Sequence, residues 1–121
     1  MKQRILLIDD DPLVLRSFAK LLSAEGYEII PAASYADALA AINEKDFDLI
    51  VSDIRMPGKN GVETVSDIQS RLIKAGKKDL PIIFITGYAE FGSELHANFL
   101  GEILHKPLDN ERLLGAIRDY L

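Results

Sequence analysis

The sequence predicts a single α/β domain of 121 residues built on a mainly parallel sheet. Three observations indicate this class. Short apolar runs alternate with segments of helical periodicity along the whole chain. The runs near residues 4–8, 48–52 and 82–86 are almost continuous in Ile, Leu, Val and Phe, which is typical of strands covered on both faces. Polar side chains follow these runs directly, where ligand sites of open α/β sheets lie.

Two further strands are less apolar than these three. Residues 27–31 mix Tyr, Glu and Ile with Pro31, which cannot donate a hydrogen bond to a neighbouring strand. We therefore place this strand at an edge of the sheet. The short stretch Ile103-Leu104 is the fifth strand, and we place it at the opposite edge.

The first two helices have recognisable start signals. Asp11-Pro12 supplies an N-cap and a proline at the first helical position, and Gly26 ends this helix. Ser34 is the expected N-cap of the second helix. The residues expected to face the core are Val14, Leu15, Phe18, Leu21 and Leu22 in the first helix and Ala36, Leu39, Ala40 and Ile42 in the second.

Three more helices complete the expected set of five. Asn60 or Gly61 opens the third, and Gly76 ends it. The fourth is expected from Phe91 to Asn98, where a glycine and a serine weaken the helical signal. Asp109 caps the fifth. The expected inward-facing residues are Val62, Val65, Ile68 and Leu72 in the third helix and Leu113, Leu114 and Ile117 in the fifth.

Composition narrows the classes of function. The net charge of −5 disfavours a module that binds nucleic acid by itself, because such modules show a basic surface. The chain contains no cysteine, which excludes disulfides and thiolate chemistry. It has no stretch long enough to span a membrane and no signal peptide, so we expect a cytoplasmic protein. Lys74, Lys77, Lys78 and Asp79 are interpreted as a solvated turn.

Carboxylates follow two apolar runs that we expect to be neighbouring strands. Asp9 and Asp10 come after the first run, and Asp53 follows a second run, Leu49-Ile50-Val51. Like charges gathered at one sheet edge raise one another's pKa unless a cation neutralises them. Hard carboxylate oxygens suit Mg²⁺ (or Mn²⁺) better than a soft metal. Two more polar residues that end apolar runs complete a candidate phosphate site: Thr86 and Lys106.

These motifs, taken together and in this order, resemble the receiver domain of two-component response regulators. The segments that carry the resemblance are ILLIDDDP at 5–12, VSDIRMPGKNG at 51–61, FITGYA at 84–89 and HKP at 105–107. The resemblance covers the whole chain, so residues 1–121 are interpreted as one receiver domain. It implies a flavodoxin-like, doubly wound, five-stranded parallel sheet in the order 2-1-3-4-5 with five helices.

The resemblance also implies a phosphorelay function. Asp53 would accept a phosphoryl group from a phosphohistidine on a sensor histidine kinase or a phosphotransfer protein. Asp9 and Asp10 would hold Mg²⁺ together with Asp53 and the backbone carbonyl of Arg55. Such a domain is not an enzyme toward a separate substrate, because it catalyses only its own phosphorylation and dephosphorylation. An output domain or a homodimer is a further possible partner, with no direct role for nucleic acid or membrane.

Two more residues receive roles from the resemblance. Lys106 and the Thr86 hydroxyl would contact phosphoryl oxygens, and the Lys106–Pro107 bond would be cis. Movement of Thr86 would alter the face formed by the fourth helix, the fifth strand and the fifth helix. Receivers often have an aromatic residue three positions before the lysine, where this chain has Ile103. This departure puts the aromatic version of the switch in doubt.

Two other functions stay open at this point. A pseudo-receiver would bind its partner without phosphate, and Ile103 gives that alternative some weight. A phosphatase of the haloacid dehalogenase type would use Asp9 as its nucleophile in an Asp-x-Asp motif. The second alternative lacks the usual Thr or Val two residues after the second aspartate, where this chain has Leu13.

Overall fold

The computed structural model describes residues 2–54, 60–87, 101–106 and 108–121. Within these residues it contains five strands and four helices. The fourth helix expected from the sequence, Phe91 to Asn98, lies outside the described residues. In chain order the elements are β1 (Arg4–Ile8), α1 (Pro12–Ala24), β2 (Glu28–Ala32), α2 (Tyr35–Glu44), β3 (Leu49–Asp53), α3 (Gly61–Lys74), β4 (Ile82–Thr86), β5 (Glu102–His105) and α5 (Asn110–Tyr120).

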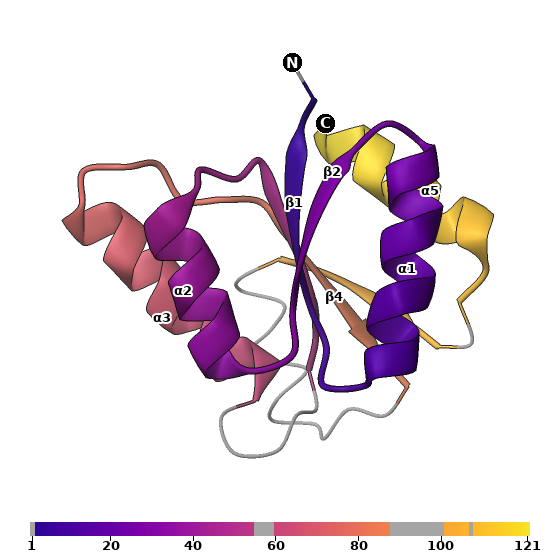
Figure 1. Cartoon of the computed structure of the whole chain (residues 1–121), viewed down its shortest axis with the longest axis horizontal. Coiled ribbons are helices and arrows are strands. Elements are labelled where there is room, and N and C mark those ends of the chain that lie inside the picture. The colour runs from indigo at the N-terminus through magenta and orange to yellow at the C-terminus, as the bar shows by residue number, and fades with distance from the viewer. Residues whose placement is uncertain (1, 55–59, 88–100, 107) are drawn as a thin grey trace.

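All strand pairs are parallel, and the strands lie in the order β2-β1-β3-β4-β5. This confirms the strand order expected from the sequence, with β2 and β5 at the edges. Helices α1 and α5 cover one face of the sheet, and α2 and α3 cover the other (Figure 1). The polypeptide therefore forms three layers, and the carboxyl ends of all the strands reach the same edge of the sheet.

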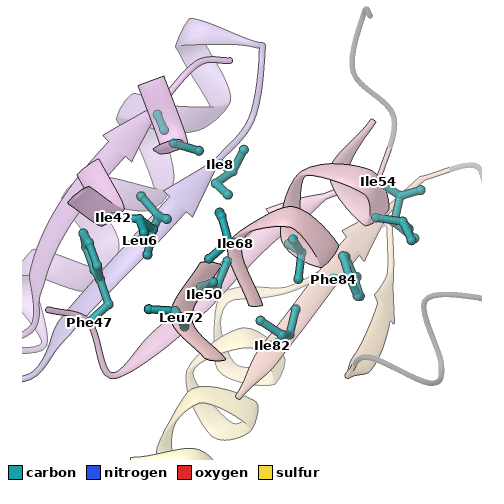
Figure 2. Packing of buried hydrophobic residues seen from close by; sticks show 14 residues of the cluster. Leu6, Ile8, Ile42, Phe47, Ile50, Ile54, Ile68, Leu72, Ile82 and Phe84 are labelled. Atoms are coloured by element: carbon teal, nitrogen blue, oxygen red, sulfur yellow. The ribbon is translucent and has the colours of Figure 1, made fainter. Parts of the chain in front are cut away.

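Alternate residues of each central strand enter two separate hydrophobic clusters. Leu6 and Ile8 of β1 pack in the cluster under α2 and α3, whereas Ile5 and Leu7 pack in the cluster under α1 and α5. Figure 2 shows the first of these clusters. Because the central strands are buried on both faces, nearly every position is apolar, and most of the polar residues lie at or next to a strand end.

Polar side chains begin the helices where the sequence indicates. Asp11 accepts hydrogen bonds from the backbone N–H groups of the first turn of α1, and Ser34 and Asp109 do the same for α2 and α5. Asn60 caps α3 in a capping box, in which Glu63 returns a hydrogen bond to the Asn60 backbone. These caps fix the points at which the chain leaves the carboxyl edge of the sheet. No described helix combines the length and apolar character needed to cross a bilayer.

The inward face of α2 differs from the expected one. Ala36 and Ala40 are exposed, whereas Ala38 and Ile42 are buried and Leu39 packs beside them. The helix is rotated so that the Ala38–Ile42 pair, four residues apart, meets the sheet. Alanine fits both a core and a surface, so the sequence could not fix this rotation. The expected inward faces of α3 and α5 are confirmed, and so is that of α1 except for Val14, which is half-buried and belongs to neither cluster.

Both ends of the chain lie at the amino end of the strands, opposite the edge at which β1 and β3 end (Figure 1). Strand β1 runs from this end into the sheet, and α5 returns to it along one face. The carboxyl edge is formed instead by the loops that follow the strands.

Candidate functional site

Three carboxylates gather at the carboxyl edge of the sheet. Asp9 and Asp10 follow β1, and Asp53 is the last residue of the adjacent strand β3. The two strands reach the edge together because their register pairs Ile8 with Ser52. One carboxylate oxygen from each aspartate lies within 4.8 Å of the others. The structure therefore brings together the three side chains that the sequence analysis proposed as metal ligands.

The three aspartates differ in their access to solvent. Asp9 is 4% exposed, the side chain of Asp53 is 13% exposed, and Asp10 lies at the surface. Asp9 is also the most firmly held, because its Oδ1 accepts a hydrogen bond of 2.9 Å from the backbone N–H of Asp11. Its own backbone N–H donates to the carbonyl of Ala32 at the end of β2. The cluster thus has a fixed inner carboxylate and an accessible outer one.

The pKa of the Asp9 carboxyl is raised from 3.8 to about 6, and burial is the largest cause. The negative charges of Asp53 and Asp10 also raise it, while the hydrogen bond from Asp11 and the positive charge of Lys106 lower it. The sequence analysis expected repulsion between carboxylates to be the main cause. Removal of Asp9 from water is the larger cause, because this residue is covered by neighbouring strand ends.

Lys106 directs its ammonium group toward the acidic cluster. Its Nζ lies 3.9 Å from Oδ2 of Asp53, and its side chain remains 35% exposed. The backbone N–H of Lys106 donates to the carbonyl of Thr86 at 2.8 Å, which ties the end of β5 to the end of β4. A Cβ atom at Gly87 would lie 3.3 Å from Cδ of Lys106, so the small residue leaves space for the lysine chain.

Thr86 ends β4, between the strands that carry Asp53 and Lys106. It is buried, and the register pairs it with His105 of β5. On its other side, β4 pairs with β3 such that Ile85 lies opposite Asp53. The hydroxyl-bearing residue therefore belongs to the same edge as the acidic cluster and the lysine.

Two expected site features lie outside the described residues. These are the backbone carbonyl of Arg55 and the peptide bond between Lys106 and Pro107. Ile103 is described: it lies in β5 opposite Phe84 and packs against the cluster under α2 and α3. An aliphatic side chain thus occupies the position at which related domains often carry an aromatic ring.

Two residues beside Asp53 were not recognised from the sequence. The buried Ser52 hydroxyl donates a hydrogen bond of 2.9 Å to the backbone carbonyl of Asp53. The backbone of Gly61 packs so closely on the same carbonyl that a Cβ atom there would lie 1.8 Å from its oxygen. A serine within an apolar strand was the available signal for the first contact. Nothing in the sequence indicated the second, since Gly61 also suits a helix start.

The donor set fits a small divalent cation. All three side chains supply hard carboxylate oxygens, and the exposed position of Asp10 leaves room for water ligands, which Mg²⁺ retains readily. The raised pKa of Asp9 shows that its ionised form is unfavourable where it is buried, and that the positive charge of Lys106 does not fully compensate. A bound dication would supply that charge.

The doubly wound sheet, with its carboxylate cluster, threonine and lysine at one edge, defines the protein as an α/β domain with a polar ligand site at the carboxyl ends of its strands. The chain belongs to the response regulator receiver domain family, whose family model matches residues 5–118. The resemblance seen in the sequence motifs is therefore confirmed at the level of the family.

Curated relatives include proteins of different lengths. The transcriptional regulatory protein GlrR of Escherichia coli is 34% identical over 119 residues, which cover 97% of this chain and 26% of that protein. Sporulation initiation phosphotransferase F of Bacillus subtilis is 27% identical, over 100% of this chain and 95% of that protein. The chain thus spans about a quarter of the length of the regulator and nearly all of the phosphotransferase.

Solved structures share the fold over its full extent. The chemotaxis protein CheY4 of Vibrio cholerae superposes with a TM-score of 0.88 at 27% identity, covering 100% of both chains. The response regulator TrrA of Thermotoga maritima, solved in complex with Mg(2+)-BeF, gives a TM-score of 0.84 at 32% identity, covering 98% of this chain and 99% of that one. These similarities agree with the strand order described above.

Proposed function

We propose that this domain is the phosphoacceptor of a two-component phosphorelay, with Asp53 as the residue that is phosphorylated. The single observation that carries the proposal is the convergence of Asp9, Asp10, Asp53 and Lys106 at one edge of the sheet. Membership of the receiver family supports this function. The phosphoryl donor is a phosphohistidine on a sensor histidine kinase or a phosphotransfer protein.

Asp53 is the nucleophile of the proposed reaction. One of its carboxylate oxygens forms a bond to phosphorus while the bond between phosphorus and the donor nitrogen breaks. The donor histidine keeps the electron pair of the broken bond, and the product is an acyl phosphate on Asp53. The side chain is 13% exposed, which leaves it accessible to a donor while its backbone is held by Ser52 and Gly61.

The barrier to this reaction is electrostatic, because an anionic carboxylate approaches an anionic phosphoryl group. Charge in the transition state spreads over three phosphoryl oxygens. The Lys106 ammonium group, 3.9 Å from Asp53, lies where it can bind one of these oxygens after a modest movement. Thr86, at the end of the intervening strand, supplies a hydroxyl donor for another.

Asp9, Asp10 and Asp53 would hold the cation, together with the backbone carbonyl of Arg55. When bound, Mg²⁺ supplies positive charge that offsets the negative charge of the transferring group. The response regulator TrrA was solved in complex with Mg(2+)-BeF, which supports Mg²⁺ as the cation. The proposed domain turns over no separate substrate and catalyses only its own phosphorylation and dephosphorylation.

Phosphorylation would act on a surface beyond the site. The added group brings about two negative charges and three strong acceptors. Thr86 ends β4 and Lys106 directly follows β5, and the hydrogen bond between their backbones couples the two strand ends. A shift of either residue toward phosphate would therefore be transmitted to β5 and to α5. We propose that the output face includes these elements and that Ile103 replaces the aromatic switch.

Intact-mass measurement tests the proposal directly. Incubation of the protein with acetyl phosphate and Mg²⁺ should add the mass of one phosphoryl group, and the addition should require Mg²⁺. Asp53→Asn should abolish the adduct. Asp109→Asn is a matched control, because it also removes a negative charge and asparagine remains a good helix cap.

Each alternative function predicts a different result in this experiment. Absence of an adduct on the unaltered protein, under conditions in which a known receiver is labelled, would favour a pseudo-receiver. Labelling that persists in Asp53→Asn and disappears in Asp9→Asn would favour a phosphatase of the haloacid dehalogenase type. Membership of the receiver family supports neither of these alternatives.

A further inference from the structure

A pocket lies at the amino end of the strands, opposite the candidate phosphorylation site. It has a volume of about 330 Å³ and is formed by the end of α2, the segment before β3, the end of α3 and the segment before β4. Its floor is apolar and its rim is charged. The floor residues are Ile42, Phe47, Leu72 and Leu80, and the rim residues are Lys45, Asp46, Lys77 and Lys78.

The pocket lies against one end of the core under α2 and α3. Ile42, Phe47 and Leu72 are 6%, 8% and 7% exposed, whereas the other fully buried members of that cluster are at most 3% exposed. Figure 2 shows these three side chains at the end of the cluster remote from Ile54, which follows β3 at the carboxyl edge. An aromatic ring and two aliphatic side chains of the core therefore form part of the pocket wall.

The rim has an excess of positive charge in a protein of net charge −5. Lys77 forms an ion pair of 2.9 Å with Asp46, which neutralises one lysine. Within the described part of the chain, no ion pair engages Lys45 or Lys78. Lys45 lies near Glu28, but Arg4 already pairs with that carboxylate. Two lysines of the rim, one after α2 and one after α3, therefore remain available.

A simpler role accounts for part of this arrangement. Helices α2 and α3 both end beside the pocket, and lysines near a helix C-terminus stabilise its partial negative charge. That role explains the sign of the charges but not the apolar pocket between them. An apolar centre surrounded by a charged rim is the arrangement found in surfaces that bind protein segments.

We propose that this pocket binds an acidic peptide segment of a partner protein, with one large apolar side chain inserted between Phe47, Leu72 and Leu80. Acidic residues on either side of the inserted side chain would pair with Lys45 and Lys78. The sequence analysis interpreted the lysines after α3 as an ordinary solvated turn, because it could not place them beside Lys45 and an apolar opening.

Binding at this pocket is independent of the acidic cluster. The two sites lie at opposite ends of the strands and share no residue. A partner could therefore hold the domain at one end while a phosphoryl donor reaches Asp53 at the other. The proposal does not depend on Asp53 being phosphorylated, and Asp53→Asn should bind the acidic segment as tightly as the unaltered protein.

An NMR titration of the ¹⁵N-labelled chain tests the proposal. The probe is a short peptide of glutamates with a single central phenylalanine. We expect saturable shifts at residues 45–47 and 77–80 and none at Asp9, Asp10 or Asp53. Replacing the peptide's phenylalanine with serine should abolish binding, and raised salt should weaken it. Shifts spread over other faces, or no saturable binding, would overturn the proposal.

A pair of charge-reversal variants tests the role of the rim. The double variant Lys45→Glu/Lys78→Glu should bind the peptide at least about tenfold more weakly, because attractive contacts become repulsive. Arg16→Glu/Lys20→Glu on α1 changes the net charge equally on the other face of the sheet and should bind normally. Equal affinity for both variants would contradict the proposal.

Two further outcomes remain decisive. If the variant Lys45→Glu/Lys78→Glu fails to fold, two measurements on the unaltered protein still test the proposal. Peptide binding that does not weaken with salt, or that survives replacement of the peptide's phenylalanine by serine, would contradict it. Decanoate serves as a small amphipathic acid for comparison. If decanoate occupies the pocket and the peptide does not, the pocket is a small-molecule site and the proposal is wrong.

Discussion

The ammonium group of Lys106 lies 3.9 Å from the carboxylate of Asp53, across the strand that ends in Thr86. This separation is longer than a hydrogen bond, so the two groups attract each other without direct contact. A phosphoryl group on Asp53 would add oxygens between the two residues, so the Lys106 ammonium group could contact a phosphoryl oxygen with little movement. The position of Lys106 therefore suits contact with phosphate better than contact with the metal ligands.

Lys106→Ala should leave Mg²⁺ binding within a few-fold of the unaltered protein, because lysine supplies no metal ligand. It should weaken the link between phosphate and the output face. The measurement is the set of phosphorylation-induced NMR shifts around Ile103, with Lys20→Ala on α1 as the control. Unchanged shifts around Ile103 in the Lys106 variant would contradict the proposed role.

Asp9→Asn should stabilise the metal-free protein at neutral pH. The folded-state pKa of about 6 exceeds the ordinary value of 3.8, so folding favours the protonated carboxyl. Ionisation of Asp9 therefore costs stability, and that cost grows as pH rises from about 4 to 6, up to about 3 kcal/mol. The measurement is urea unfolding of both proteins across this range.

The difference between the two proteins is the informative quantity, because other carboxylates also titrate in this range. It should be small near pH 4, increase up to pH 6 and stay constant above it. Asp11→Asn provides the matched control, since asparagine also caps a helix and the carboxylate of Asp11 is exposed. An equal gain from Asp11→Asn would mean that general charge reduction is the cause.

Mg²⁺ affinity should depend on pH through the same residue. A proton on Asp9 competes with the cation, so apparent affinity should fall by about tenfold for each pH unit below about 6. Three charged groups at the site also influence the pKa of Asp9: Asp10 and Asp53 raise it, and Lys106 lowers it. Calorimetric titration with Mg²⁺ measures the effect. A flat profile between pH 5 and pH 7 would be incompatible with Asp9 as a ligand of this raised pKa.

Gly61→Ala should disturb the phosphoacceptor directly. The added Cβ would lie 1.8 Å from the Asp53 carbonyl oxygen, so the start of α3 or the end of β3 must move. We expect a loss of about 1–3 kcal/mol of stability and slower acyl phosphate formation. Urea unfolding and a time course of intact mass measure the two effects.

Gly115→Ala is the matched control for that substitution. A Cβ at Gly115 meets no atom within 4 Å, and the residue lies inside helix α5. Alanine there should raise stability by up to about 1 kcal/mol and leave phosphorylation unchanged. Similar losses in both variants would indicate that the contact with the Asp53 carbonyl has no special importance.

The features that the sequence predicted correctly depend on short-range patterns. Apolar runs located the strands, Asp11, Asn60 and Asp109 marked helix starts, and polar residues after strands marked the site. The features it could not supply depend on packing between distant segments. The fit of Gly61 against β3 is one of these.

The electrostatics of Asp9 illustrate the same limit. The sequence indicated that its pKa would be raised, since several carboxylates were expected together. It assigned the shift mainly to repulsion, because burial at a strand end depends on how β2 and β3 flank β1. The inward face of α2 was likewise undetermined, as alanine suits either environment.

The placement of both chain ends at the amino end of the strands has a practical consequence (Figure 1). A fluorophore or an affinity tag joined at either end would stand clear of Asp53 and its neighbours. Surface-immobilised protein would keep that edge free for a donor, whereas the same attachment would crowd the lysine-rimmed pocket. Assays of the two sites therefore call for different ways of anchoring the molecule.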